Sequence, residues 1–303
     1  MRTIFSLILG FLIFTNLNAQ KKDLSLDLQV GNTYKQSSAV SLTMGQQMGG
    51  QLMNIKMTIS GSNDFTVKDL KDGAYTMETK YTALKMKMEM PQGTMEYSSD
   101  GTGEDLISKM LNGMVSKPFT VVLSKKGKVL AINDYDKLWD VAFASIPEIS
   151  EENKAQIQEE IKQSYGADAL KGNIEAATAI YSETPVEKGD SWDITTSLDS
   201  TISLNQNSTY TYVDTTPDYT LISGKATLTS SKESVKSAAG EMEYALDGTN
   251  TSTIKVDNAS GWIIEAVIDQ NIKGSISIEG NPAMPDGMTI PMEVTSTSTV
   301  TNK

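Results

Sequence analysis

The chain of 303 residues contains no cysteine and no histidine. Without cysteine it has no disulfide bond, no thiol nucleophile and no thiolate metal site. Without histidine it has no serine-histidine-acid triad, no histidine-ligated zinc or iron, and none of the usual proton shuttles near neutral pH. An enzyme built from this sequence would depend on carboxylates, lysine, tyrosine or a serine-lysine pair. We therefore expect no enzymatic activity, no catalytic residue, no metal site and no cofactor.

Basic residues are scarce as well. Lysine and arginine together number 26 against 38 acidic residues, so the formal net charge is -12. Affinity for a phosphate backbone depends on clustered lysine and arginine. Nucleic acid is therefore not an expected partner.

The sequence also lacks a long apolar run. The run from Ile4 to Phe14 is shorter than the roughly 20 residues that a membrane-spanning helix needs. With Arg2 before it and Ala19 after it, this run is typical of a cleavable secretory signal over residues 1–19. We expect a chain that is exported to the periplasm or secreted from a bacterium, and that does not span the membrane.

A short motif occurs twice. Gly31-Asn32-Thr33-Tyr34 returns as Gly189-Asp190-Ser191-Trp192, and each copy opens a stretch of alternating apolar and polar residues. Gly-Asn and Gly-Asp are turn residues, and the aromatic residue that follows suits the start of a strand. The two copies predict one kind of β unit used twice.

Alternation of this kind extends over residues 20–103 and 185–303. Strands with one apolar face belong to antiparallel sheets, and long antiparallel strands twist and curl. We therefore predict an α+β fold, in which two similar β halves form a strongly curved antiparallel sheet or an open barrel. The predicted strands are 24–30, 34–44, 53–59, 65–70, 75–90, 192–204, 208–213, 219–230, 241–246, 249–256, 262–278 and 288–300.

Residues 104–184 change to helical spacing. Helices are predicted over 106–114, from Asn133 or Asp134 to Pro147, from Ser150 to Gly166, and around Leu170 to Tyr181, with a hairpin over 119–132 between the first two. We expect this helical insert to pack on the concave side of the sheet or across its mouth. Residues 20–303 would then form one folded unit.

The order of several motifs resembles a known family. The motifs are Gly31-x-x-Tyr34, a methionine-rich hairpin, Lys126-Gly127-Lys128-Val129, Pro185-Val186-x-x-Gly189-Asp190-x-Trp192, Gly261-Trp262 and a threonine-rich last strand. Together they resemble a family of exported bacterial proteins of about this length, which is defined by a domain of unknown function. The resemblance implies no functional residues. More distantly, a curved sheet with helices inside it is similar to periplasmic carriers of lipoproteins and lipids.

Methionines gather at alternating positions. Met86, Met88 and Met90 share one face of a predicted strand, and Met53 and Met57 share a second one. Core packing with flexible methionine as filler is the first interpretation. The second is an adaptable apolar groove for acyl or peptide ligands, and the third is a Cu(I) site made of thioethers.

From these faces we predict a non-catalytic exported protein that binds an apolar ligand, a lipid or an acyl chain, between curved sheet and helices. Its candidate ligand-binding residues are Met53, Met57, Met86, Met88, Met90, Leu138 and Trp139. The alternative is a structural or interaction module of the bacterial envelope, with an envelope protein as partner. A carboxylate-based glycan hydrolase is a further alternative, which requires two acids converging in a cleft, one with a raised pKa.

Overall fold

The structure is a computed structural model, and it describes residues 21–48, 51–101, 103–144, 158, 161–162, 165–198, 203–231, 234–237, 240–280 and 286–302. Within the strands, the side chains of residues 46–48, 51–53, 235–237 and 240 fall outside this description. The predicted signal segment, 1–19, lies outside the described residues. So does most of the helix predicted from Ser150 to Gly166.

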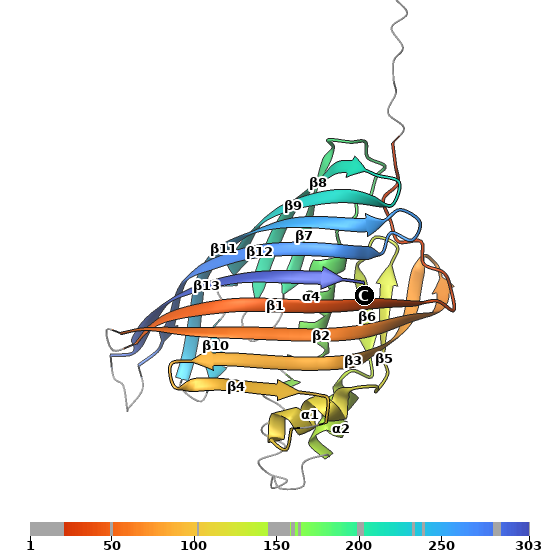
Figure 1. Cartoon of the computed structure of the whole chain (residues 1–303). Helices are drawn as coiled ribbons and strands as arrows, with labels where there is room; N and C mark the ends of the chain where they lie inside the picture. The colour runs from red at the N-terminus through yellow and green to blue at the C-terminus, as the bar shows by residue number, and fades with distance from the viewer. Residues whose placement is uncertain are drawn as a thin grey trace, which may run out of the picture.

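A single antiparallel sheet of 13 strands makes up most of the molecule (Figure 1). Its strand order is β6-β5-β3-β2-β1-β13-β12-β11-β9-β8-β7, while β4 pairs with β3 and β10 with β11. The bounds are β1 Thr33–Met48, β2 Gln51–Lys71, β3 Ala74–Met90, β4 Gly93–Ser98, β5 Phe119–Ser124, β6 Val129–Asn133, β7 Ser191–Leu198, β8 Leu204–Thr215, β9 Tyr219–Ser230, β10 Val235–Ser237, β11 Gly240–Asp257, β12 Ile263–Ile278 and β13 Met288–Thr301. The predicted curved, open antiparallel sheet is confirmed.

The two β halves meet at the centre of this sheet. Strand β1 pairs with β13, with Ser41 opposite Thr297, and β1 also pairs with β2 (Figure 1). The hydrogen-bonded ladder therefore continues from one half into the other. Both halves belong to one sheet.

The repeated motif forms the same turn in both halves. Gly31 and Gly189 have positive φ angles of 91° and 95°, which favour glycine. In each copy the glycine N–H donates to the carbonyl of a residue on the neighbouring strand, Val67 on β2 or Tyr212 on β8. The N–H of that residue donates back to the carbonyl of the residue after the glycine. These bonds are 2.8 to 3.0 Å long. The motif is thus a device that starts a strand in each half.

One end of the curved sheet is filled by aromatic side chains and covered by the N-terminal segment. The ring of Trp262 lies 5.3 Å from that of Tyr34 and 5.4 Å from that of Phe65. In front of this cluster, the chain from residue 21 to residue 32 runs across the turns that join the strands. We call this end of the sheet the closed end.

The predicted strand at residues 24–30 is wrong, although its alternation is real. Leu24, Leu26 and Leu28 are buried, but Val30 is 57% exposed. The backbone of this segment bonds to separate partners, with the N–H of Leu26 donating to Lys125 and that of Asp27 to Ser260. A ladder needs one continuous partner strand, and this segment has none among the described residues.

Three predicted strand boundaries are also wrong. Gly61-Ser62-Asn63 and Asp247-Gly248 look like turns, yet β2 and β11 run straight through them. A Cβ atom at Gly248 would lie 2.8 Å from the carbonyl oxygen of Asn271, so glycine serves here for close strand contact. Conversely, the strand predicted over 192–204 is two strands, because Leu198 pairs with Leu204 across a reversal of the chain.

Three helices are described: α1 Leu106–Met114, α2 Asp136–Ala144 and α4 Ala167–Thr178. Helix α1 confirms the prediction for 106–114. The predicted hairpin is β5–β6, and β6 is an edge strand of the sheet. Helix α4 contacts both β6 and β7, the two terminal strands (Figure 1). One hydrogen bond joins it to β6, where the N–H of Val129 donates to Glu175 Oε2 at 3.2 Å. Just past its C-terminal end, Trp192 Nε1 of β7 donates to the carbonyl of Ile180 at 3.1 Å.

Candidate functional site

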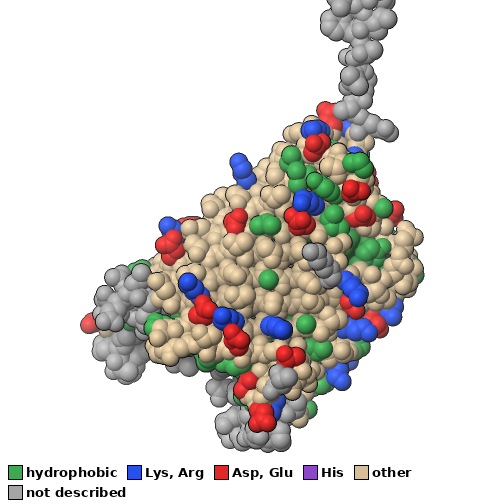
Figure 2. Space-filling view, in the orientation of Figure 1, with side chains coloured by type: hydrophobic (Ala, Val, Ile, Leu, Met, Phe, Trp, Pro, Cys, Tyr) green, Lys and Arg blue, Asp and Glu red, His purple; other side chains and the backbone are tan. Residues whose placement is uncertain are grey.

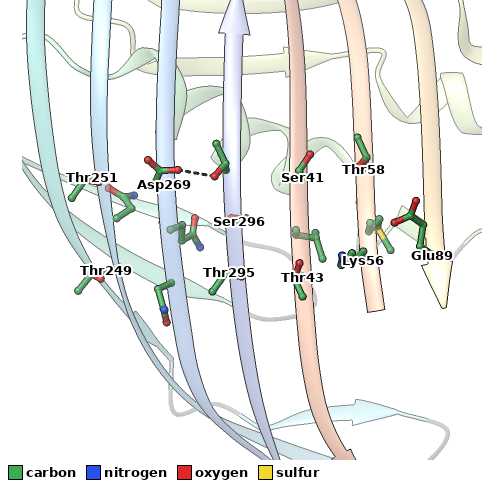
Figure 3. Close-up of a pocket in the computed structure, with 16 residues that line it drawn as sticks. Ser41, Thr43, Lys56, Thr58, Glu89, Thr249, Thr251, Asp269, Thr295 and Ser296 are labelled. Atoms are coloured by element: carbon green, nitrogen blue, oxygen red, sulfur yellow. Dashed lines mark hydrogen bonds between the residues drawn. The ribbon is translucent and has the colours of Figure 1, made fainter. Parts of the chain in front are cut away.

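The face of the sheet that points away from α4, which we call the outer face, is polar. Strand register places Thr58, Ser41, Thr297, Asp269 and Thr251 in one row across five strands. They line a shallow depression of about 580 Å³, in which Thr297 Oγ1 donates to Asp269 Oδ1 at 2.6 Å (Figure 3). Figure 2 shows this face mainly in tan, the colour of the backbone and of side chains that are neither hydrophobic nor charged, with scattered hydrophobic and charged side chains between. A solvated outer face explains these rows.

The opposite face, which we call the inner face, borders a cavity of about 440 Å³ beneath α4. Leu170, Ile174 and Ala177 of the helix form one wall, and sheet residues that include Phe65 and Trp262 form the other. None of the described residues that line this cavity is charged. The cavity is therefore shaped by aromatic, aliphatic and neutral polar groups.

Neutral polar side chains cross the sheet wall of this cavity, and we call them the polar belt. The belt consists of Gln36, Ser38, Asn63, Thr79, Gln206, Asn250, Ser252, Gln270 and Ser298. Two of its members bond to each other, since Asn250 Nδ2 donates to Gln206 Oε1 at 3.1 Å. Burying such groups costs free energy unless they find partners, so a belt of this kind calls for an explanation.

Two atoms of the belt are buried without a hydrogen-bond partner. They are Oδ1 of Asn63 on β2 and Oγ1 of Thr79 on β3. Thr79 is 1% exposed and lies opposite Phe65, and Phe65 and Asn63 lie on the same face of β2 because they are two residues apart. Both polar groups are thus diagonal neighbours on the wall of one cavity.

The tyrosines of the cavity wall remain neutral. The phenol of Tyr81 donates to that of Tyr135 at 3.2 Å. Burial, and secondarily the neighbouring phenol of Tyr135, hold the pKa of Tyr81 well above its ordinary value. Burial also raises the pKa of Tyr210. The wall therefore carries no charge that changes near neutral pH.

Farther from the closed end, the inner face becomes apolar. Met57 lies directly opposite Met88 on β3 and opposite Leu42 on β1, and Met86 lies opposite Ile59. The set, which we call the methionine face, is Val40, Leu42, Met44, Ile55, Met57, Ile59, Met86, Met88, Met90, Met95 and Tyr97. It continues into a small cluster formed by Tyr244, Leu246, Ile272 and Met292.

The candidate residues from the sequence fall into two groups. Met57, Met86, Met88 and Met90 are half-buried and share the methionine face. Leu138 on α2, which is 2% exposed, belongs to the main hydrophobic core, and Trp139 beside it is partly buried and packs against that core. The side chain of Met53 lies outside the described residues.

The polar belt is the part of the site that sequence reasoning missed. Asn63 lies between the predicted strands 53–59 and 65–70, but β2 runs through it and its side chain lines the cavity. The available indication was the alternation itself. Counting by two from Phe65 places Asn63 on the buried face.

Among the described carboxylates, those with a clearly shifted pKa are all shifted downward. Within the described part of the chain, no group of three acidic, histidine or cysteine residues is placed to hold a metal ion. Hydrogen bonds lower the pKa of Glu89, from Lys87, and that of Asp105, from the backbone of Ser108. Lys188 does the same for Asp214. A general acid requires a shift in the opposite direction.

The fold and this interior define an open, curved antiparallel sheet that holds a neutral cavity under a helix. The chain belongs to a family of unknown function, DUF6263, which matches residues 72–263. This confirms the predicted resemblance to a domain of unknown function. No curated protein matches the chain.

Among solved structures, lipovitellin is 10% identical with a TM-score of 0.49; the match covers 91% of this chain and 25% of that one. This chain thus spans a quarter of the lipovitellin chain. An outer membrane channel from Pseudomonas putida F1 is 8% identical, with a TM-score of 0.27 and coverage of 91% and 97%. OmpF of Salmonella typhi is 7% identical, with a TM-score of 0.23 and coverage of 89% and 98%. At such scores these likenesses carry no argument about function. No helix among the described residues has the length and apolarity to cross a bilayer.

Proposed function

We propose that this protein is a non-catalytic, exported binder of an apolar ligand, a lipid or an acyl chain, held against the inner face of the sheet. The methionine face supplies the surface, and α4 covers the concave side above the adjoining cavity. Met57, Met86, Met88 and Met90 contact the ligand directly. Leu138 of α2 is buried in the main hydrophobic core and Trp139 packs against that core, so they support the fold beside the ligand rather than contact it.

The observation that carries this proposal is the incomplete burial of the methionine face. Ile59 is 39% exposed and Met95 is 37% exposed, although they lie beside half-buried methionines on the same face. Contiguous apolar surface of this kind marks binding sites in soluble proteins. Methionine adds adaptability, because its unbranched thioether chain repacks around ligands of different shape.

The test is recovery of ligand with the protein. Chain purified from its host without detergent is analysed by native mass spectrometry and by lipid extraction, and we expect a co-purifying apolar molecule. The double variant Met57→Gln/Met88→Gln, which places amides at one opposed pair of the methionine face, should lose most of it.

A matched control lies one residue farther along the same two strands. Thr58 and Lys87 also face each other, but on the outer face. The variant Thr58→Gln/Lys87→Gln should retain ligand at the wild-type level. Protein that carries no apolar molecule in any preparation, and that binds no added alkyl probe, would overturn the proposal.

The alternative, an interaction module of the envelope, draws on the outer face. Its rows of threonine, serine and asparagine are exposed on neighbouring strands, as in the row through Ser41 and Thr297. Crosslinking in the native envelope distinguishes the two functions. Recovery of one protein partner through outer-face positions, with an empty interior, would favour the module.

A further inference from the structure

We propose that the ligand is an uncharged amphiphile, whose hydroxyl-bearing head group binds at the polar belt while its acyl chain lies along the methionine face. This inference rests on the proposed function, and it adds the chemical class of the head group and the direction in which the molecule lies.

The first support is the zonation of single strands. On β1, the inner face passes from Gln36 and Ser38 of the belt to Leu42 and Met44 of the methionine face. Strand β2 shows the same order, because Asn63 is followed in the same direction by Ile59 and Met57, each opposite a residue of β1. Polar groups and apolar groups therefore meet along one boundary that crosses adjacent strands.

This boundary matches an amphiphile better than a plain hydrocarbon. A hydrocarbon lying across the belt would leave amides and hydroxyls buried and unpaired, which is costly. A molecule with a polar end satisfies the belt and covers the methionine face at the same time.

The second support is the neutrality of the cavity. The described lining residues include no Lys, Arg, Asp or Glu, and the pKa of Tyr81 and that of Tyr210 are raised by burial. A carboxylate or phosphate head group would enter this cavity without a cation to pair with. The lining thus favours an uncharged head group.

The third support is the pair of unpartnered atoms. Asn63 Oδ1 can only accept a hydrogen bond, and Thr79 Oγ1 can donate or accept. Both are buried on the cavity wall, on neighbouring strands. A head group with adjacent hydroxyls supplies the donor that Asn63 requires and a partner for Thr79.

The test compares three probes with the same chain length: a 1-monoacylglycerol, the ionised fatty acid at pH 8, and the alkane. We expect delipidated full-length protein to bind the monoacylglycerol at least about tenfold more tightly than the fatty acid, as one unpaired buried charge alone costs more than that ratio.

The variant Thr79→Val removes the hydroxyl while keeping the shape of the side chain. It should weaken monoacylglycerol binding roughly three- to tenfold, a loss that corresponds to one hydrogen bond. Alkane binding should stay unchanged. At the same time the ligand-free variant should melt at a higher temperature than wild type, because an unpaired buried hydroxyl is gone. The control Thr58→Val, on the outer face of β2, should leave the ratio of monoacylglycerol affinity to fatty-acid affinity unchanged.

Asn63→Leu provides a second measurement if Thr79→Val does not fold. The neutral head group would be overturned if wild type bound monoacylglycerol and fatty acid equally, or if the ratio of these two affinities were unchanged in both Thr79→Val and Asn63→Leu. Binding of the alkyl probes would still support the proposed function in that case. Failure of all three probes to bind would overturn the proposed function itself.

Discussion

Burial at single residues separates the two groups of candidate side chains. Leu138 is enclosed by the main core, whereas Met88 is half-buried on the methionine face. A fully enclosed side chain contributes chiefly to stability, and a half-buried one on an open face remains accessible to a ligand. Substitutions at the two positions should therefore affect different measurements.

Leu138→Ala should lower the free energy of unfolding by about 2–5 kcal/mol, because it removes a buried side chain and leaves a cavity. Met88→Ala should cost less than about 2 kcal/mol, since water already reaches part of that site. Denaturant titration of both variants measures the difference. Equal losses would mean that the methionine face is packed as tightly as the core.

Stability should also depend on pH through buried tyrosines. Burial raises the pKa of Tyr181 above its ordinary value of 10.0, and the Tyr181 phenol donates to the carbonyl of Gly261. A phenol whose pKa is higher in the folded state than in the unfolded state stabilises the fold fully below the unfolded value, and this contribution is lost as pH rises through the folded value.

With no histidine in the chain, the denaturant midpoint should change little between roughly pH 6 and pH 9 and should fall above about pH 10. Tyr181→Phe should be less stable at neutral pH but should show a shallower fall at alkaline pH. A steep change between pH 6 and pH 8 would contradict this assignment.

Among the secondary-structure elements, α4 contacts both terminal strands of the sheet, β6 and β7. It is fixed to the β5–β6 hairpin where Thr178 Oγ1 donates to the carbonyl of Gly127 at 2.6 Å. Backbone comes so close at this point that a Cβ atom at Gly127 would lie 1.9 Å from the carbonyl oxygen of Thr178. Only glycine permits this contact.

Gly127→Ala and Gly31→Ala form a matched pair, because both residues have positive φ angles, 81° and 91°. A Cβ atom at Gly31 meets no described atom within 4 Å, so that variant should lose only about 1–2 kcal/mol from its left-handed backbone. Gly127→Ala should lose more than about 3 kcal/mol, because it also displaces α4. Equal stability of the two variants in thermal melts would show that α4 does not depend on this contact.

At the scale of elements, alternation and helical spacing predict most of the sheet, the β5–β6 hairpin and α1. They also predict that Met86, Met88 and Met90 share a face, because side-chain direction in a strand repeats every two residues, whereas the register of β2 against β3 is what adds Met57 to it. These patterns fail where the structure of a segment depends on which other segment it bonds to or packs against. Residues 24–30 alternate like a strand but bond to separate segments, and the position of Leu138 follows from helix packing that no local pattern specifies.

Alternation can place a single member of the polar belt on the inner face, but it cannot bring the members together. Its members are far apart in the sequence, as Asn63 and Asn250 illustrate, and only the strand register brings them to one cavity. Gly-Ser-Asn and Asp-Gly are frequent in turns, so local chemistry favours a chain reversal at these points. In this molecule a neighbouring strand overrides that preference.

For the whole molecule, the central pairing of β1 with β13 has a consequence for how the chain acquires its structure. Ala39 and Thr299, which meet in this ladder, are 260 positions apart in the sequence. Contacts between such distant segments form slowly, because the entropy cost of closing a very long loop comes before any stabilisation by ladder hydrogen bonds. Until the last strand has left the ribosome, β1 has no partner on one of its two edges. The chain should therefore remain without its central ladder throughout synthesis, a state that suits threading through a translocation channel if the protein is exported as we propose.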